Sequence, residues 1–381
     1  MVKLRIMKII KLITFFLLIS SSACKKKIEV DLISHNGAIY SLDDNNNIYE
    51  AVAVKNGKII ALGKNDQILN KYTSEKNIDL KGFTVFPGFI DAHCHFLEYG
   101  LQKNMVDVSS AQSFKEIIEI LKLNQNKVAN EWLVGYGWDQ NQWGDKNWPN
   151  NKLLNENFKN INVILKRIDG HVIMANQKAI QTLKIPVDTI ISAGYIEKID
   201  NVVTGLFVDN AMSLILNKIP KSDEILKKKA ILKAQGDCLA FGLTTIDIAG
   251  LNKEDIDLLE KLHSTNELKI KVYAMLLNNE ENFKFYIDSI GHPYKTNKLN
   301  VRSFKFFADG SLGSRGACLL KPYSDQENSY GMLLQKKELF EKKLRKIKLA
   351  GFQACTHSIG DSTNRSVLKS YSKILKSSND L

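Results

Sequence analysis

The chain has 381 residues, of which 44% are hydrophobic and 25% are charged. This balance is that of an ordinary globular protein with ample apolar material, and the length indicates two domains or one large barrel with additions. The formal net charge of +12 is spread along the chain, without a basic motif interleaved with aromatic residues. We therefore interpret it as a solvated basic surface and expect no nucleic-acid partner.

Residues 1–23 have the pattern of a bacterial lipoprotein signal peptide. Lys8 and Lys11 precede the apolar run 12–19, which is too short to span a bilayer, and small residues then lead to Cys24. Cleavage before Cys24 and lipidation of its sulfur would anchor the chain to a membrane of the cell envelope, on the periplasmic or surface side. An ordinary secretory signal or an uncleaved anchor is the alternative, because Ser21 stands where these signals usually carry Leu.

Residues 24–83 look like the N-terminal part of a small β domain. Short runs alternate apolar and polar residues, and Asn-Gly pairs at 36–37 and 56–57 predict hairpin turns. The segment is too short for an independent sandwich, so we expect it to be a β-sandwich portion that pairs with strands from elsewhere.

From about residue 84 apolar runs alternate with helical stretches, which indicates βα units, a parallel sheet and the α/β class. An insertion, residues 98–221, follows the first predicted barrel strand. Insertions there reach the C-terminal rim, where barrel enzymes build their sites, so we expect this one to cap the pocket. The predicted barrel strands are residues 85–93, 243–248, 270–277, 301–308 and 352–357.

Three of these strands end in side chains that can bind metal. His93 and His95 alternate with Cys94, so both histidines point to one side, where two imidazoles can hold a divalent ion. Lys305 lies in the apolar run 304–307, where an ammonium is costly to bury unless it is neutral or modified. A neutral lysine reacts with carbon dioxide to form an anionic carbamate that can bridge two metals, and His357 ends the last predicted strand.

Each of these residues also has an ordinary structural interpretation. The two histidines are equally typical of a half-buried strand in which both are hydrogen-bonded. Lys305 could extend to solvent or pair with an acid such as Asp309.

Six motifs in order strengthen the metal interpretation. Together they resemble the amidohydrolase superfamily, and most closely its amidohydrolase-3 branch, which includes the N-substituted formamide deformylases. The resemblance covers nearly the whole mature chain and implies a TIM-type (β/α)8 barrel that hydrolyses carbon–nitrogen bonds other than peptide bonds. The motifs are PGFIDAHCH (87–95), YGWDQNQW (136–143), RIDGH (167–171), TGLFVDNAM (204–212), KFFADGSLGSRGA (305–317) and HSIGD (357–361).

The resemblance also implies residue roles. One or two divalent ions would be held by His93, His95, carbamylated Lys305 and His357. We expect zinc, although iron, manganese or nickel suit the same ligands. A metal-bound water would attack a small-molecule amide or formamide. We expect residues 310–315 to form a mobile loop at the rim of the pocket. For the tryptophans of the insertion, packing in a hydrophobic core is the alternative to contact with substrate. Expected substrate contacts are Trp138, Asp139, Arg167, Asp169, His171, Asp309 and Arg315.

Parts of the family pattern are missing. Only five barrel strands are recognisable, no histidine follows His357, and the later carboxylates Asp361 and Asp380 do not stand where the family's strand-eight catalytic Asp belongs. We therefore expect an incomplete (β/α)8 barrel, apparently truncated at the C-terminus, with little activity unless a C-terminal fragment complements it. The alternative is a non-catalytic envelope lipoprotein that keeps residues 84–381 as a scaffold for ligand binding.

Overall fold

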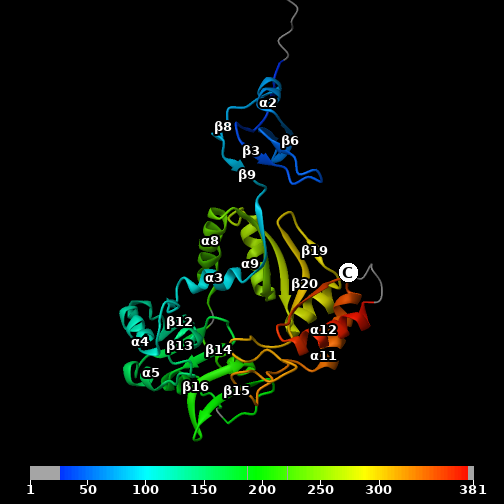
Figure 1. The fold of residues 1–381 in the computed structure, drawn as a ribbon. Helices are drawn as coiled ribbons and strands as arrows, with labels where there is room; N and C mark the ends of the chain where they lie inside the picture. The colour runs from blue at the N-terminus through cyan, green and yellow to red at the C-terminus, as the bar shows by residue number, and fades with distance from the viewer. Residues whose placement is uncertain (1–25, 187, 221, 376–381) are drawn as a thin grey trace, which may run out of the picture. The chain divides into compact units, whose positions relative to one another are not determined.

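The computed structural model describes residues 26–186, 188–220 and 222–375, which fall into two compact units, Met1–Phe89 and Ile90–Leu381 (Figure 1). The predicted signal peptide and Cys24 lie outside the described residues, so the lipid anchor stays a prediction. Among the described residues no helix combines the length and the apolarity needed to cross a membrane.

The first unit is built from short strands. β2 and β5 pair antiparallel with Ile33 opposite Ala53, and both residues lie in a small core with Val30, Ile68 and Tyr72. The strands are β1 Ile28–Glu29, β2 Leu32–His35, β3 Ala38–Tyr40, β4 Ile48–Tyr49, β5 Ala51–Lys55, β6 Lys58–Gly63, β7 Tyr72–Thr73, β8 Asn77–Asp79 and β9 Thr84–Val85, with helix α2 Asn65–Lys71.

The hairpin turn predicted at Asn56-Gly57 is confirmed. It joins β5 to β6, and both of its residues have positive φ, as a two-residue turn between twisted strands requires. The sheets of this unit have the orders β6-β5-β2-β8, β4-β3-β9 and β1-β7. The pairing of this unit with strands from elsewhere stays a prediction.

The second unit contains the predicted parallel sheet. Its order, β10-β17-β18-β20 with β21 beside β20, follows the sequence, and β17, β18, β20 and β21 pair parallel. The predicted strands after the first are confirmed, with ends shifted by at most three residues. The strands are β10 Phe89–Cys94, β17 Leu243–Leu251, β18 Lys271–Leu277, β20 Leu299–Phe307 and β21 Gln353–His357, with β19 Tyr294–Lys295 antiparallel to β20.

The predicted first strand, residues 85–93, is wrong at its beginning. Val85 belongs to β9, which pairs with β3 in the first unit, and Pro87-Gly88 separates it from β10. Proline has no backbone N–H to donate to a sheet, so the extended run is broken there and β10 begins at Phe89.

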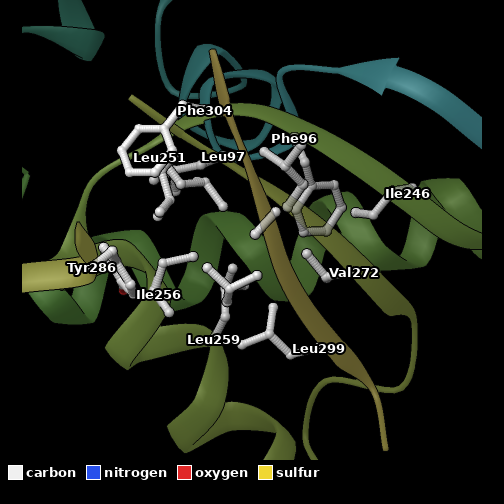
Figure 2. Packing of buried hydrophobic residues seen from close by; sticks show 14 of the residues in the cluster. Phe96, Leu97, Ile246, Leu251, Ile256, Leu259, Val272, Tyr286, Leu299 and Phe304 are labelled. Carbon is white, nitrogen blue, oxygen red and sulfur yellow. The ribbon is translucent and has the colours of Figure 1, made fainter. Parts of the chain in front are cut away.

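Helices and strands of this unit share a large apolar core (Figure 2). Phe304 and Phe306 on β20 are fully buried in it. Burial of each such side chain stabilises the folded state by about 1.5–3 kcal/mol. Because neighbouring strand residues face opposite sides, Lys305 between them faces away from this core. The helices are α3 Phe96–Gln102, α8 Glu224–Ala240, α9 Lys253–Ser264, α10 Glu280–Asn282, the π-helix η4 Phe283–Ile290, α11 Lys337–Leu349 and α12 Asp361–Ile374.

The insertion forms a mixed sheet that the sequence patterns did not predict. Its order is β11-β12-β13-β14-β16-β15, and alternate residues of β13 enter separate cores, Leu165 on one side and Ile164 on the other. The elements are β11 Val106–Asp107, α4 Phe114–Leu123, η1 Gln125–Lys127, β12 Trp132–Trp138, η2 Gln140–Gln142, α5 Lys152–Asn157, β13 Asn162–Arg167, β14 Val172–Ala175, α6 Gln177–Thr182, β15 Gly194–Ile199, β16 Val202–Asp209, η3 Asn210–Met212 and α7 Ser213–Leu216.

Candidate metal centre

A cavity of about 780 Å³ opens in the second unit, where the carboxyl ends of β10, β18, β20 and β21 meet the insertion. The volume suits a small molecule. His93, His95, Lys305 and His357 all line it, and so do residues of the insertion on and beside β13, β14 and β16.

His93 and His95 lie side by side at the carboxyl end of β10. Their ring centroids are 5.8 Å apart, and Cys94 between them packs against the apolar core instead. Asp91 accepts a hydrogen bond from the backbone N–H of His93 at 3.0 Å. Surrounding protein atoms desolvate the two rings and Lys305 adds positive charge, so the pKa of each histidine is lowered and the neutral, metal-binding form is favoured.

Lys305 reaches the cavity floor from β20. Its side chain is buried, the residue being 2% exposed, and Nζ lies 3.1 Å from His93 Nε2. The described residues place no carboxylate oxygen within 4.0 Å of Nζ. Desolvation therefore lowers the pKa of Lys305, with only a weaker opposing influence from Cys355. Burial excludes a lysine that extends to solvent, and the environment favours the neutral amine from which a carbamate forms.

Pairing of Lys305 with Asp309 is also excluded. Both carboxylate oxygens of Asp309 accept hydrogen bonds from backbone N–H groups, those of Cys318, Ile359 and Gly360, at 2.8–3.0 Å. Asp309 therefore ties the loop after β20 to the loop after β21, and it does not line the cavity.

His357 ends β21 opposite Phe307 of β20 and presents an unsatisfied nitrogen. Its Nε2 is buried, and no residue in the described part of the chain hydrogen-bonds to it. Burial lowers the pKa of the ring, and the nearby His171 lowers it further. A neutral imidazole with a free buried lone pair is the form that a divalent ion binds, so this atom supports a metal at this position.

The donor set fits a divalent metal on one condition. Within the described ranges, no group of three His, Cys, Asp or Glu side chains is arranged to hold an ion. The four predicted ligands are imidazoles and the Lys305 amine, and among them only a modified Lys305 can supply ligand charge. A carbamate supplies that charge as two oxygen donors, and with it the set suits zinc and related ions.

The comparison with known protein families matches residues 76–378 to one described as the amidohydrolase family. This chain belongs to the amidohydrolase family. It is 29% identical over 356 residues to YtcJ of Bacillus subtilis, a protein assigned as an amidohydrolase, covering 90% of this chain and 66% of that protein. It is 23% identical over 373 residues to the N-substituted formamide deformylase of Arthrobacter pascens, and the match covers 92% of this chain and 67% of that enzyme.

Solved structures of similar fold include metal-dependent hydrolases. One from Pyrococcus horikoshii has a TM-score of 0.69 and 27% identity, covering 90% of this chain and 68% of that one. One from Pyrococcus furiosus has a TM-score of 0.66 and 25% identity, covering 90% and 70%. A (β/α)8-type fold and a divalent metal therefore belong to the family of this chain. The chain spans 66% and 63% of the lengths of two matched relatives, YtcJ and the Arabidopsis thaliana protein LONG AFTER FAR-RED 3.

Of the expected substrate contacts in this member of the amidohydrolase family, Asp169 and His171 line the cavity. Trp138 does not. It is 1% exposed within the core of the insertion, and its Nε1 donates to the backbone oxygen of Leu165 at 3.2 Å. Core packing, the alternative for this tryptophan, is therefore the one that the structure supports, because the apolar ring ends β12 on the side facing that core.

Arg167 and Asp139 form a buried cluster beside the cavity. The guanidinium, in a residue only 3% exposed, pairs with Asp139 and Asp169, and its Nε donates to Gln140 Oε1 at 2.9 Å. A buried charge needs partners of this kind, so Arg167 and Asp139 hold the insertion together, and neither lines the cavity. Arg315 is also directed elsewhere, to Asp325 at 2.7 Å.

The rim loop expected to be mobile is held by hydrogen bonds. Ser311 donates to Asp169, and Asn141 donates to the Gly313 carbonyl at 3.1 Å. The loop also packs closely on Asp209, where a Cβ on Gly310 would lie 2.7 Å from a carboxylate oxygen. Only glycine permits this approach, so the loop 310–316 is held in close contact with the insertion beside the cavity.

Sequence reasoning missed several cavity residues. Asp209 was inside a recognised motif, as the one acid ending an apolar strand, and its carboxylate contacts His171. Lys166 and Glu98 also line the cavity without a direct ion pair. Desolvation lowers the pKa of Lys166 and raises that of Glu98, and the charge of each partly opposes the shift of the other. Neither residue stands in a pattern that marks a site.

Proposed function

We propose that this protein is a metal-dependent hydrolase that cleaves carbon–nitrogen bonds other than peptide bonds, in a small-molecule amide or formamide. The observation that carries the proposal is the surroundings of Lys305, a buried amine beside His93 that no carboxylate of the described residues approaches. The naming of one relative as an N-substituted formamide deformylase supports the formamide class.

The metal, which we expect to be zinc, would be held by His93, His95, His357 and the carbamate of Lys305. When bound, it would lower the pKa of a coordinated water and polarise the substrate carbonyl. The protein's part is to supply imidazoles whose lowered pKa favours the neutral form, and to keep the amine of Lys305 free of competing acids.

The cavity walls indicate what the substrate carries on its nitrogen or acyl side. Aliphatic and aromatic side chains line much of the cavity, which suits a bulky, partly apolar group. The tryptophan ring of Trp138 does not contribute, because it is buried in the core of the insertion. The apolar lining comprises Leu101, Met105, Ile168, Met212, Leu216, Leu277, Phe307, Leu334 and Leu339.

The test is hydrolysis by purified protein loaded with zinc and bicarbonate, assayed against a panel of N-formyl and N-acyl amines for release of formate, acid and amine. We expect turnover by the unchanged protein and loss of at least about 100-fold in Lys305→Ala. Lys271→Ala is the matched control, because Lys271 begins β18 and is exposed. Bound metal without turnover of any amide would instead favour a ligand-binding protein.

We also propose attachment to the envelope membrane through lipid on Cys24, a proposal that rests on the leader pattern alone. Cells grown with labelled palmitate should yield a labelled, membrane-associated protein. Cys24→Ala should lose the label and leave the membrane fraction. An unlabelled but membrane-associated wild type would point to the uncleaved anchor.

A further inference from the structure

His171 and Asp209 are joined by two hydrogen bonds at the ends of neighbouring strands of the insertion. The backbone N–H of Asp209 donates to the His171 carbonyl at 2.9 Å, and His171 Nδ1 lies 2.7 Å from Asp209 Oδ1. The antiparallel pairing of β14 and β16, with Val172 opposite Val208, sets both residues in this register. The imidazole is thus held by the strands themselves.

The second bond determines what the ring offers to the cavity. With Nδ1–H donating to Asp209, the neutral ring keeps its lone pair on Nε2. The Asp209 side chain is 0% exposed and that of His171 is 13% exposed, so the pair is open only on the imidazole side, which lines the cavity. A carboxylate behind an imidazole is the arrangement that orients histidine ligands of metals.

One carboxylate oxygen of Asp209 is left unsatisfied by the residues that the structure describes. Its Oδ2 is buried without a hydrogen-bond partner, and Gly310 and Gly316 pack against the carboxylate so closely that a Cβ on either would lie 2.7 Å from an oxygen. Water is therefore kept away from this group. A buried carboxylate is costly unless a positive charge lies nearby, and a cation on the far side of His171 would supply it.

The opposite wall of the cavity presents a matching ligand. The ring centroids of His171 and His357 are 5.4 Å apart with a tilt of 34°, close to the 5.8 Å between His93 and His95. His357 Nε2 is buried and has no hydrogen-bond partner among the described residues. The cavity thus holds two histidine pairs of similar spacing, with Lys305 Nζ beside the first pair.

We propose that His171, oriented by Asp209, is a metal ligand that shares with His357 the second divalent ion of the cavity. His93 and His95 hold the first ion, and the Lys305 carbamate bridges the two. The inference rests on the proposed metal-dependent function and goes beyond it, because it assigns a ligand from the insertion to a site otherwise built by the barrel sheet. It also explains how each ion obtains three protein ligands.

The experiment measures bound metal and not activity. The full chain, dialysed with zinc and bicarbonate, is analysed for zinc by mass spectrometry, and cobalt titration is followed by visible absorption. We expect two equivalents for the unchanged protein and one for His171→Ala. Asp209→Asn should weaken the second equivalent by about 10–100-fold. His292→Ala, which removes a histidine outside the cavity, should keep both equivalents.

A rescue variant separates ligand loss from misfolding. His171→Gly supplied with imidazole should regain the second cobalt equivalent and its absorption band. Two equivalents of unchanged affinity in His171→Ala would overturn the inference and leave the hydrolase proposal standing. Loss or weakening of the second equivalent in these variants as predicted, with no amide hydrolysed by the unchanged protein, would overturn the hydrolase proposal alone. An unchanged protein that binds no metal would overturn both.

Discussion

Replacing Lys305 by Met should stabilise the metal-free protein while abolishing its metal site. Met keeps the length and most of the volume of the side chain but removes an amine that is buried at 2% exposure without a carboxylate partner. Leaving such a polar group poorly satisfied costs about 1–3 kcal/mol of folding free energy. The partner atom, His93 Nε2, lies at the open cavity, where water can replace the lost contact.

The pH dependence of this gain follows from the lowered pKa of Lys305. Burial moves the folded-state pKa below the ordinary 10.5, so the unfolded chain binds more protons between the two values. Burial of the Lys305 amine therefore destabilises the unchanged protein fully at pH values below the folded-state pKa. This destabilisation disappears as the pH rises past the pKa of the unfolded chain. Each unit of lowering costs about 1.4 kcal/mol in the low-pH limit.

The assay is thermal unfolding followed by circular dichroism in the presence of a chelator. At about pH 7 we expect Lys305→Met to raise the melting temperature by about 2–10 °C, and the difference should shrink toward about pH 10. Lys271→Met, on the exposed beginning of β18, should change little at either pH. A lower melting temperature for Lys305→Met, or a gain that does not depend on pH, would refute the reasoning.

Four further predictions follow from the site. In ¹³C-bicarbonate the protein should show a carbamate carbon signal by NMR that Lys305→Ala lacks. Removal of carbon dioxide should reduce the amount of bound zinc, and an unchanged zinc content would contradict the bridging role. Asp309→Ala should cost about 3–5 kcal/mol in urea unfolding, because three backbone N–H groups lose a charged acceptor. Arg167→Met should cost about 3–5 kcal/mol by leaving its carboxylate partners unpaired, with exposed Arg302→Met as control. Trp138→Phe should lower stability by about 1–2 kcal/mol while leaving KM for any hydrolysed substrate unchanged, since a raised KM would return this residue to the substrate site.

The barrel sheet was largely readable from the sequence because its signals are local. Runs such as 270–277 are apolar on both faces and end in polar residues, and this pattern survives whatever packs against it. The His-x-His spacing likewise depends only on strand alternation, which places His93 and His95 together. The error at residues 85–88 arose because the apolar pattern runs through a proline that ends one strand before the next begins.

The insertion was much less readable. Its mixed sheet buries both faces, so β13 and β14 show no alternation that distinguishes a cavity face from a core face. Arg167 and Trp138 resemble substrate contacts in sequence. In the structure Arg167 is buried against the acids that follow β12 and β13, and Trp138 packs in the core of the insertion beside Trp143. Asp169 is two residues from Arg167 and Asp139 is 28 residues away, but the burial that turns these side chains away from the cavity arises only on folding.

The sequence by itself determined the family, the parallel strands and the types of metal-competent side chains, because each is encoded in short patterns that neighbouring residues establish. The tertiary structure decided which of those side chains face the same space. It alone brings Lys305 next to His93 and His171 opposite His357, and it alone occupies Asp309 with backbone N–H groups. Burial and pairing depend on contacts between residues far apart in the chain, and these contacts exist only once the sheets have packed.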